Sequence, residues 1–156
     1  MATQNPSETE TFDRNVRMHV FGTTAETGKV PSVQEIAEAL GRPQPAVEDA
    51  LRRLAAGRVL VLAPGTVNIW MANPFSSVPT GFRVFVDRRR YYGNCIWDAL
   101  GIPAILSADA RIETQCDDCG GSEMVLEVRN GVLTRSEGII HFAVPAARWW
   151  ENIGYT

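Results

Sequence analysis

The chain has 156 residues, a net charge of −3, and a composition of 45% hydrophobic and 21% charged residues. This balance is typical of a folded domain and excludes a disordered chain, and no apolar run is long enough for a membrane-spanning helix. The acidic balance argues against a surface built to bind nucleic acid. The polar N-terminus is unlike a signal peptide, so we expect a cytoplasmic protein with reduced cysteines.

Residues 15–72 predict a small helical lobe, preceded by a mobile tail at residues 1–14. A short helix is expected over residues 15–21. The stretch PSVQEIAEALG then has the pattern of an amphipathic helix, because apolar residues recur at helical spacing. Ser32 and Glu35 form a capping box at its start.

A second helix and two strands complete this lobe. RPQPAVEDALRRLAAG predicts the helix, and RVLVL and VNIWM predict the strands, which together give the order of a winged helix-turn-helix. Such a unit binds DNA through its second helix. Here that helix carries an acidic pair, Glu48 and Asp49, beside Arg52 and Arg53. The acidic pair would repel phosphates, so DNA binding is disfavoured and a packing scaffold is expected.

Residues 73–156 predict a second lobe of strands and helices, which makes the fold class α+β. NPFSSVPTGF is loop-like, FRVFV alternates like a strand, and residues 88–90 are expected in a solvated turn. NCIWDALG is predicted to be a helix that ends at Gly101. Strands are then expected in ARIETQC, SEMVLEVRNG and GIIHFAVP, and a helix or turn in ARWWENIGYT.

Cys95 and Asp98 stand three residues apart in the apolar stretch YYGNCIWDALGIPAIL. On a helix, residues at this spacing lie on one face with their Cβ atoms about 5–6 Å apart. A thiolate is a soft metal ligand and a nucleophile, and a carboxylate beside it can transfer a proton or complete a coordination shell. The pair is therefore a candidate metal centre. The competing interpretation is that Cys95 is a core residue, as a lone cysteine on an apolar helix usually is.

A second cysteine motif, CDDCGG, contains Cys116 and Cys119. CxxC followed by glycine is half of a zinc knuckle, and a tetrahedral zinc site needs four ligands. The other candidates are Cys95, His19 and His141, and no second CxxC exists, so a complete zinc site is not indicated. The motif lies in a hairpin-like turn, unlike the redox motif of thioredoxins. Two thiols in a surface turn are the remaining interpretation.

From about residue 15 onward, the chain resembles the alkylmercury (organomercurial) lyase family. The resemblance rests on the winged helix followed by NPFSSVPTGFRV, RRYYGNCIWDALGIPAIL, RIETQCDDCGG and HFAVPAARWWENIGYT, in that order. Its most specific element is the Cys-x-x-Asp-Ala-Leu-Gly-Ile-Pro run after an aromatic-rich strand. The resemblance implies an enzyme that cleaves carbon–mercury bonds by protonolysis, with a winged-helix-like part packed on a small mixed sheet.

The resemblance also implies the site residues. Cys95 matches the family's first catalytic cysteine and Asp98 its aspartate. The family's second cysteine is expected after a Gly-Tyr-Thr-like stretch, which here reaches the last residue, Thr156, so a weakened activity is expected. Cys116 or Cys119 is the alternative second ligand. No organic cofactor is implied; the substrate is an organomercurial, the product is Hg(II), and outside thiols accept it.

Two other functions stay open on the sequence. A relative that has lost the reaction could bind zinc or copper through Cys95, Cys116 and Cys119. A repurposed relative could act as a lyase or hydrolase on a small biosynthetic intermediate, because a fold does not determine a function. A winged-helix transcription factor is disfavoured by the acidic charge.

Overall fold

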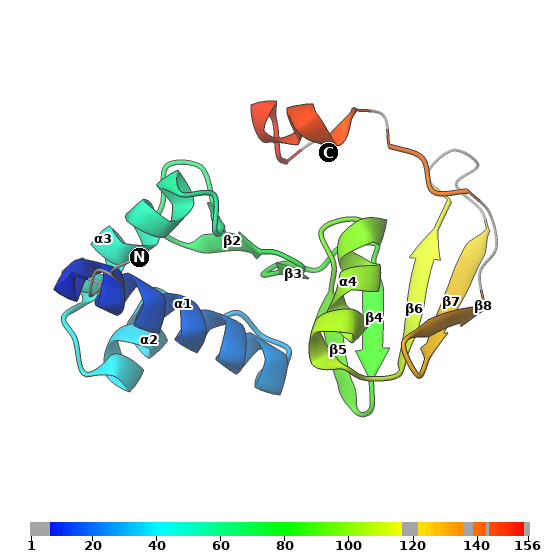
Figure 1. The fold of residues 1–156 in the computed structure, drawn as a ribbon, viewed down its shortest axis with the longest axis horizontal. Helices are drawn as coiled ribbons and strands as arrows, with labels where there is room; N and C mark the ends of the chain where they lie inside the picture. The colour runs from blue at the N-terminus through cyan, green and yellow to red at the C-terminus, as the bar shows by residue number, and fades with distance from the viewer. Residues whose placement is uncertain (1–6, 117–121, 136–138, 143, 155–156) are drawn as a thin grey trace, which may run out of the picture.

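The structure, a computed structural model, describes residues 7–116, 122–135, 139–142 and 144–154. Helices and antiparallel strands form two lobes (Figure 1), which confirms the predicted α+β class. Within these ranges, no helix combines the length and the hydrophobicity needed to cross a bilayer.

The N-terminal lobe packs three helices against a small sheet of three strands, in the order β1-β2-β3. Its core is a single apolar cluster contributed by all three helices and by β2. Leu51 and Val20 are fully buried there, and each such side chain stabilises the fold by about 1.5–3 kcal/mol. The elements are α1 Glu8–Thr27, α2 Val33–Leu40, α3 Gln44–Ala56, β1 Val61–Leu62, β2 Ile69–Ala72 and β3 Phe75–Ser76.

Helix α1 begins at Glu8 and ends at Thr27, so residues 8–14 are helical and not the mobile tail that was expected. The reason is a capping box that the sequence analysis overlooked: the Ser7 hydroxyl accepts from the Glu10 amide at 3.2 Å, and the Glu10 carboxylate accepts from the Ser7 amide at 2.7 Å. The capping box predicted at Ser32 and Glu35 is confirmed.

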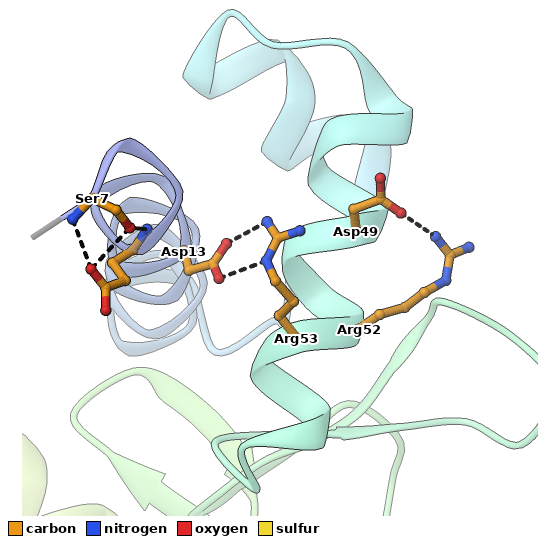
Figure 2. A network of polar contacts seen from close by, with 6 residues as sticks. Ser7, Asp13, Asp49, Arg52 and Arg53 are labelled. Carbon is orange, nitrogen blue, oxygen red and sulfur yellow. Dashed lines mark hydrogen bonds and ion pairs between the residues drawn. The ribbon is translucent and has the colours of Figure 1, made fainter.

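The arginines of α3 are paired within the lobe (Figure 2). Arg53 donates to both carboxylate oxygens of Asp13 on α1, at 2.8 and 2.7 Å, and Arg52 pairs with Asp49 at 2.8 Å. Arg53 therefore joins α3 to α1. The assignment of this lobe to the winged helix-turn-helix class stays a prediction.

The C-terminal lobe is a five-stranded sheet, in the order β5-β4-β6-β7-β8, with helix α4 on one face. All strand pairs in the described residues are antiparallel, where a mixed sheet was expected. Tight turns join β4 to β5 and β7 to β8, and such short connections require antiparallel neighbours. The elements are β4 Arg83–Val86, β5 Arg89–Tyr92, α4 Ile96–Leu106, β6 Ala110–Gln115, β7 Glu123–Arg129, β8 Val132–Arg135 and the 3-10 helix η1 Ala146–Glu151.

Helix α4 continues through Gly101 and Pro103 to Leu106, beyond the predicted end. Proline inside a helix removes one hydrogen bond, but Ile102 and Pro103 are buried against the sheet, and this packing outweighs the local preference. Gly101 lies where a Cβ would be 3.4 Å from the Pro74 ring. The loop before β4 therefore packs directly on the helix.

Three local expectations about the second lobe were wrong. Phe75 and Ser76 form strand β3 in the segment expected to be a loop, and Arg89 and Arg90 belong to strand β5 instead of a turn. In the predicted strand GIIHFAVP, the described residues 139–142 are not in a strand. In the first two cases the segment pairs with the strand that precedes it, β3 with β2 and β5 with β4, and this pairing decides the structure.

The C-terminal segment lies against the N-terminal lobe. The guanidinium of Arg58 sits 5.4 Å from the centre of the Trp150 ring. A Cβ on Gly154 would come within 2.6 Å of the Trp70 ring, so the chain passes directly over that indole. In Figure 1, η1 accordingly spans the side of the molecule where the two lobes meet.

Candidate active site

The structure brings Cys95 and Asp98 together at the start of α4, but not as two residues on a helical face. Cys95 is the N-cap, with extended backbone angles of φ −146° and ψ −177°, and the helix begins with the next residue. Asp98 lies in the first turn, three residues beyond the cap. This is the relation of the two members of a capping box, in which the first side chain faces the amide of the second residue.

Gly93 holds the segment that leads from β5 into this helix. Its amide donates to the carbonyl of Phe82 at 3.0 Å, and its carbonyl accepts from the Thr80 hydroxyl at 2.6 Å. It also forms an isolated bridge with Phe75. The loop NPFSSVPTGF thus fastens the backbone two residues before Cys95, so the position of the thiol depends on contacts far away in sequence.

We expect Gly93→Ala to destabilise the protein by about 1–3 kcal/mol, because a Cβ here would overpack the backbone. That atom would lie 2.7 Å from the Ala99 nitrogen and 3.0 Å from the Cys95 carbonyl oxygen, so α4 must shift. Urea unfolding measures the change. Gly81→Ala is the matched control, because a Cβ there meets nothing within 4 Å, and it should change the free energy of unfolding by less than about 0.5 kcal/mol. Equal effects in the two variants would contradict this account.

The Cys95 thiol is half-buried, and burial raises its pKa above the ordinary value. The amides of Asp98 and Trp97, at the positive end of the helix dipole, act in the opposite direction and lower it, although neither makes a capping hydrogen bond of full geometry. The negative charge of Asp98 adds to the rise. Without a metal, the site therefore holds a thiol; a soft cation would displace its proton.

Burial also raises the pKa of the Asp98 carboxyl, while hydrogen bonds from the side chain and the backbone of Asn94 lower it. The Asn94 amide nitrogen donates to Asp98 Oδ2 at 2.8 Å and to Asn73 Oδ1 at 3.0 Å. The carboxyl therefore keeps its proton to a higher pH than an exposed aspartate does. The thiol can bind a soft metal, and the carboxyl beside it can donate a proton to a group attached to that metal.

The comparison with known families bears on this segment. The family described as alkylmercury lyase (MerB) matches residues 75–156, just over half of the chain. The chain belongs to the alkylmercury lyase family. The match includes both Cys95 and Asp98. Comparison with curated proteins gives no match.

A solved structure extends the likeness to the whole fold. The crystal structure of the mercury-bound form of MerB2 superimposes with a TM-score of 0.61 at 22% sequence identity, covering 85% of this chain and 61% of that chain. At this identity the likeness shows the fold alone. The present chain thus spans about three fifths of the length of that protein.

No described contact joins Cys116 of the CDDCGG motif to the Cys95–Asp98 site. Cys116 follows β6 and donates its amide to Ser122, and among the described residues no three His, Cys, Asp or Glu side chains gather as a metal-binding group. Cys119 lies outside the described residues. His141 is exposed and outside any strand, and His19 lies 3.5 Å from the Thr23 hydroxyl on α1. The described residues therefore contain no zinc or copper site.

Sequence reasoning missed three residues that build the site: Gly93, Asn94 and Asn73. Asn94 directly precedes Cys95 and could have been singled out as a polar side chain four residues before Asp98. Asn73 had no such signal, because it lies 21 residues earlier and reaches Asn94 only through the packing of the loop on α4.

Proposed function

We propose that this chain cleaves carbon–mercury bonds by protonolysis, with Cys95 as the mercury ligand and Asp98 as the proton donor. The observation that supports the proposal best is a half-buried thiol and a half-buried carboxyl at one helix N-terminus, within the residues that match the alkylmercury lyase family. The substrate class is an organomercurial cation, R–Hg⁺ with an exchangeable ligand, and no organic cofactor takes part.

The first step is capture of the substrate. The Cys95 thiol loses its proton to solvent and its sulfur displaces the exchangeable ligand, which gives an S–Hg–R adduct. The raised pKa of the thiol does not prevent this, because mercury, a soft cation, binds sulfur far more strongly than it binds oxygen. The amides at the start of α4 stabilise the negative charge on the sulfur.

The second step is proton transfer to carbon. The Asp98 carboxyl gives its proton to the carbon of R, and the electron pair of the Hg–C bond becomes the new C–H bond. The products are the hydrocarbon R–H, mercury bound to Cys95, and an Asp98 carboxylate that regains a proton from water. Partial burial of Asp98 favours this role, because it raises the pKa of the carboxyl, which then holds its proton to a higher pH than an exposed aspartate does.

Release of mercury needs further sulfur. One thiolate joins Cys95 on mercury, raises its electron density and weakens the Hg–C bond; after the hydrocarbon has left, another thiolate displaces the Cys95 sulfur, which regains a proton, and the ion leaves as a dithiolate. We assign this role to thiols from outside the described site, such as a small-molecule thiol in excess. A reducing, cytoplasmic setting belongs to the same proposal, because Cys95 must stay reduced to act.

The test is single-turnover release of benzene from phenylmercury by the full chain, in the presence of excess free thiol. The proposal predicts one benzene per chain, faster than the same thiol releases it alone. Gas chromatography measures the benzene and mass spectrometry measures the mercury left on the protein. A chain that binds phenylmercury at Cys95 and never releases benzene above the thiol background would exclude the activity.

We expect the two steps to respond to pH in opposite directions. Capture speeds up as the pH rises, because more Cys95 is ionised. Benzene release from the preformed adduct slows as the pH rises through the folded-state pKa of Asp98, because the donor is then deprotonated. Rapid mixing of the adduct into buffers of different pH measures the second step alone. A release rate that increases steadily with pH would contradict the role of Asp98 as an acid.

A further inference from the structure

The side chain of Asn94 lies beside the reacting groups but takes no part in the reaction steps proposed above. It lies between the carboxyl of Asp98 and the side chain of Asn73, a residue at the end of the small sheet of the other lobe. The Asn94 amide nitrogen has two hydrogens, and each has one acceptor: Asp98 Oδ2 at 2.8 Å and Asn73 Oδ1 at 3.0 Å. Its donor capacity is therefore fully used.

The orientation of the Asn94 amide follows from these two partners. If the amide were turned over while Asp98 is ionised, its oxygen would face the carboxylate oxygen of Asp98 and the carbonyl oxygen of Asn73, and three acceptors would meet without a hydrogen between them. In the observed orientation the Asn94 Oδ1 is buried and has no hydrogen-bond partner among the described residues. Leaving an acceptor unpaired is unfavourable, so the two donated bonds outweigh it.

This arrangement distinguishes the two oxygens of Asp98. Oδ2 accepts a hydrogen bond from the Asn94 amide NH₂ group. Turning the amide so that its oxygen faces Oδ2 would break this bond and the bond to Asn73. When the carboxyl is protonated, a proton on Oδ2 would point at the hydrogen of Asn94. The proton is therefore favoured on the other oxygen, Oδ1, which receives no hydrogen bond from the Asn94 side chain.

We propose that Asn94 is a positioning residue that holds Asp98 through Oδ2 and thereby assigns the transferable proton to Oδ1, with Asn73 fixing Asn94 from the other lobe. The inference deepens the proposed function and rests on it for the identity of the reaction. The hydrogen-bonding role of Asn94 stands on the geometry alone and has a consequence that needs no substrate: it determines how firmly Asp98 holds its proton.

Among the residues that the structure describes, few other groups can affect the titration of Asp98. Cys95, on the same segment, is the titratable neighbour that interacts with it. Strand β3, which packs on α4, consists of Phe75 and Ser76 and carries no charge. On β4 and β6 the buried residues that contact α4 alternate with charged ones, which therefore lie on the opposite face of the sheet. These charged residues are Arg83, Arg111 and Glu113.

The experiment measures the Asp98 carboxyl directly, by a carbon-13 NMR titration of the labelled full chain, with Asp98→Asn to assign the signal. Asn94→Ala removes the side-chain hydrogen bond to Asp98 and keeps the one from the backbone amide, so the pKa of Asp98 should rise. Asn94→Asp adds a like charge as well and should raise it further. Asn73→Ala keeps the bond to Asp98 and should have a smaller effect, and Asn68→Ala, an exposed asparagine of the β1–β2 turn, should have none.

The same variants are then tested for benzene release from the phenylmercury adduct. Asn94→Ala should slow release by roughly 10- to 100-fold, because the acid is no longer held in place, and should move the fall of the rate to higher pH. A residue with only a structural role would change the thermal stability and leave both the titration midpoint and the pH profile where they were. Thermal unfolding of each variant confirms that it is folded.

The outcomes separate the two proposals. A folded Asn94→Ala variant in which Asp98 titrates at the wild-type midpoint overturns the role of Asn94. If instead the midpoints follow the expected order and the wild-type chain releases no benzene, the proposed reaction fails and the hydrogen-bonding role of Asn94 stands. If the titration midpoints of Asp98 and the pH profile of benzene release shift together, the proposed reaction and the role of Asn94 are both supported.

Discussion

Cys95→Ser should reduce single-turnover benzene release to the level of free thiol alone, a loss of roughly 10³-fold or more, as when a nucleophile is removed from an active site. The hydroxyl of serine is a hard ligand that stays protonated near neutral pH, so phenylmercury should not be captured. Mass spectrometry of the protein after exposure and buffer exchange should accordingly show less bound mercury at the site. Benzene release and adduct formation are thus expected to disappear together.

Cys116→Ser is the matched control, because it makes the same exchange at another half-buried cysteine of the same lobe. Cys116 follows β6 and is not part of a metal-binding group in the described residues. This variant should keep most of the activity. Loss of benzene release in Cys116→Ser, with capture intact, would instead identify Cys116 as the second sulfur and replace the external thiol in the proposed mechanism.

Asp98→Asn should separate capture from chemistry. The variant keeps an oxygen that can accept the hydrogen bond from Asn94 but has no proton to give, so the phenylmercury adduct should form on Cys95 and benzene release should fall by roughly 10²–10⁴-fold. Mass spectrometry of the trapped adduct measures capture, and gas chromatography of benzene measures release. Release at the wild-type rate would show that another acid, or solvent, supplies the proton.

Asp98→Asn should also change how the stability of the protein depends on pH. Burial raises the pKa of Asp98 in the folded state, so the stability contributed by its bound proton is full below the unfolded-state pKa and is lost as the pH rises through the folded-state pKa. Asp98→Asn has no such loss and should be at least as stable as the wild type at neutral pH. Asp87→Asn, in the exposed β4–β5 turn, is the control for the exchange itself.

Gly93 and Asn94 show how the site depends on both lobes. The backbone before Cys95 is held by Thr80 and Phe82, and the carboxyl of Asp98 is held through Asn94 by Asn73. The lobes themselves are joined by the Tyr91 hydroxyl, which donates to the carbonyl of Ala25 at 2.6 Å. Substitutions in the loop between β2 and β4 should therefore affect the chemistry without touching either reacting side chain.

The sequence by itself determined the local features of this protein. Capping boxes, helical spacing and terminal glycines located α2 and α3, and alternation located β4, β6 and β7, because these signals act between residues a few positions apart. The Cys95–Asp98 pair and its surrounding motif were enough to indicate the alkylmercury lyase family, which the match over residues 75–156 confirms. The roles of these two side chains stay predictions.

Only the tertiary structure decided what surrounds that pair. Cys95 is a helix cap because the chain leaves β5 through Gly93, whose backbone is held by residues 11 to 13 positions earlier. The short strand β3 and the run of α4 through Pro103 are set by packing that overrides local preference. The contact of Asn73 with Asn94 joins two lobes, and no spacing in a sequence encodes it, because it forms only when separate hydrophobic cores bring distant segments together.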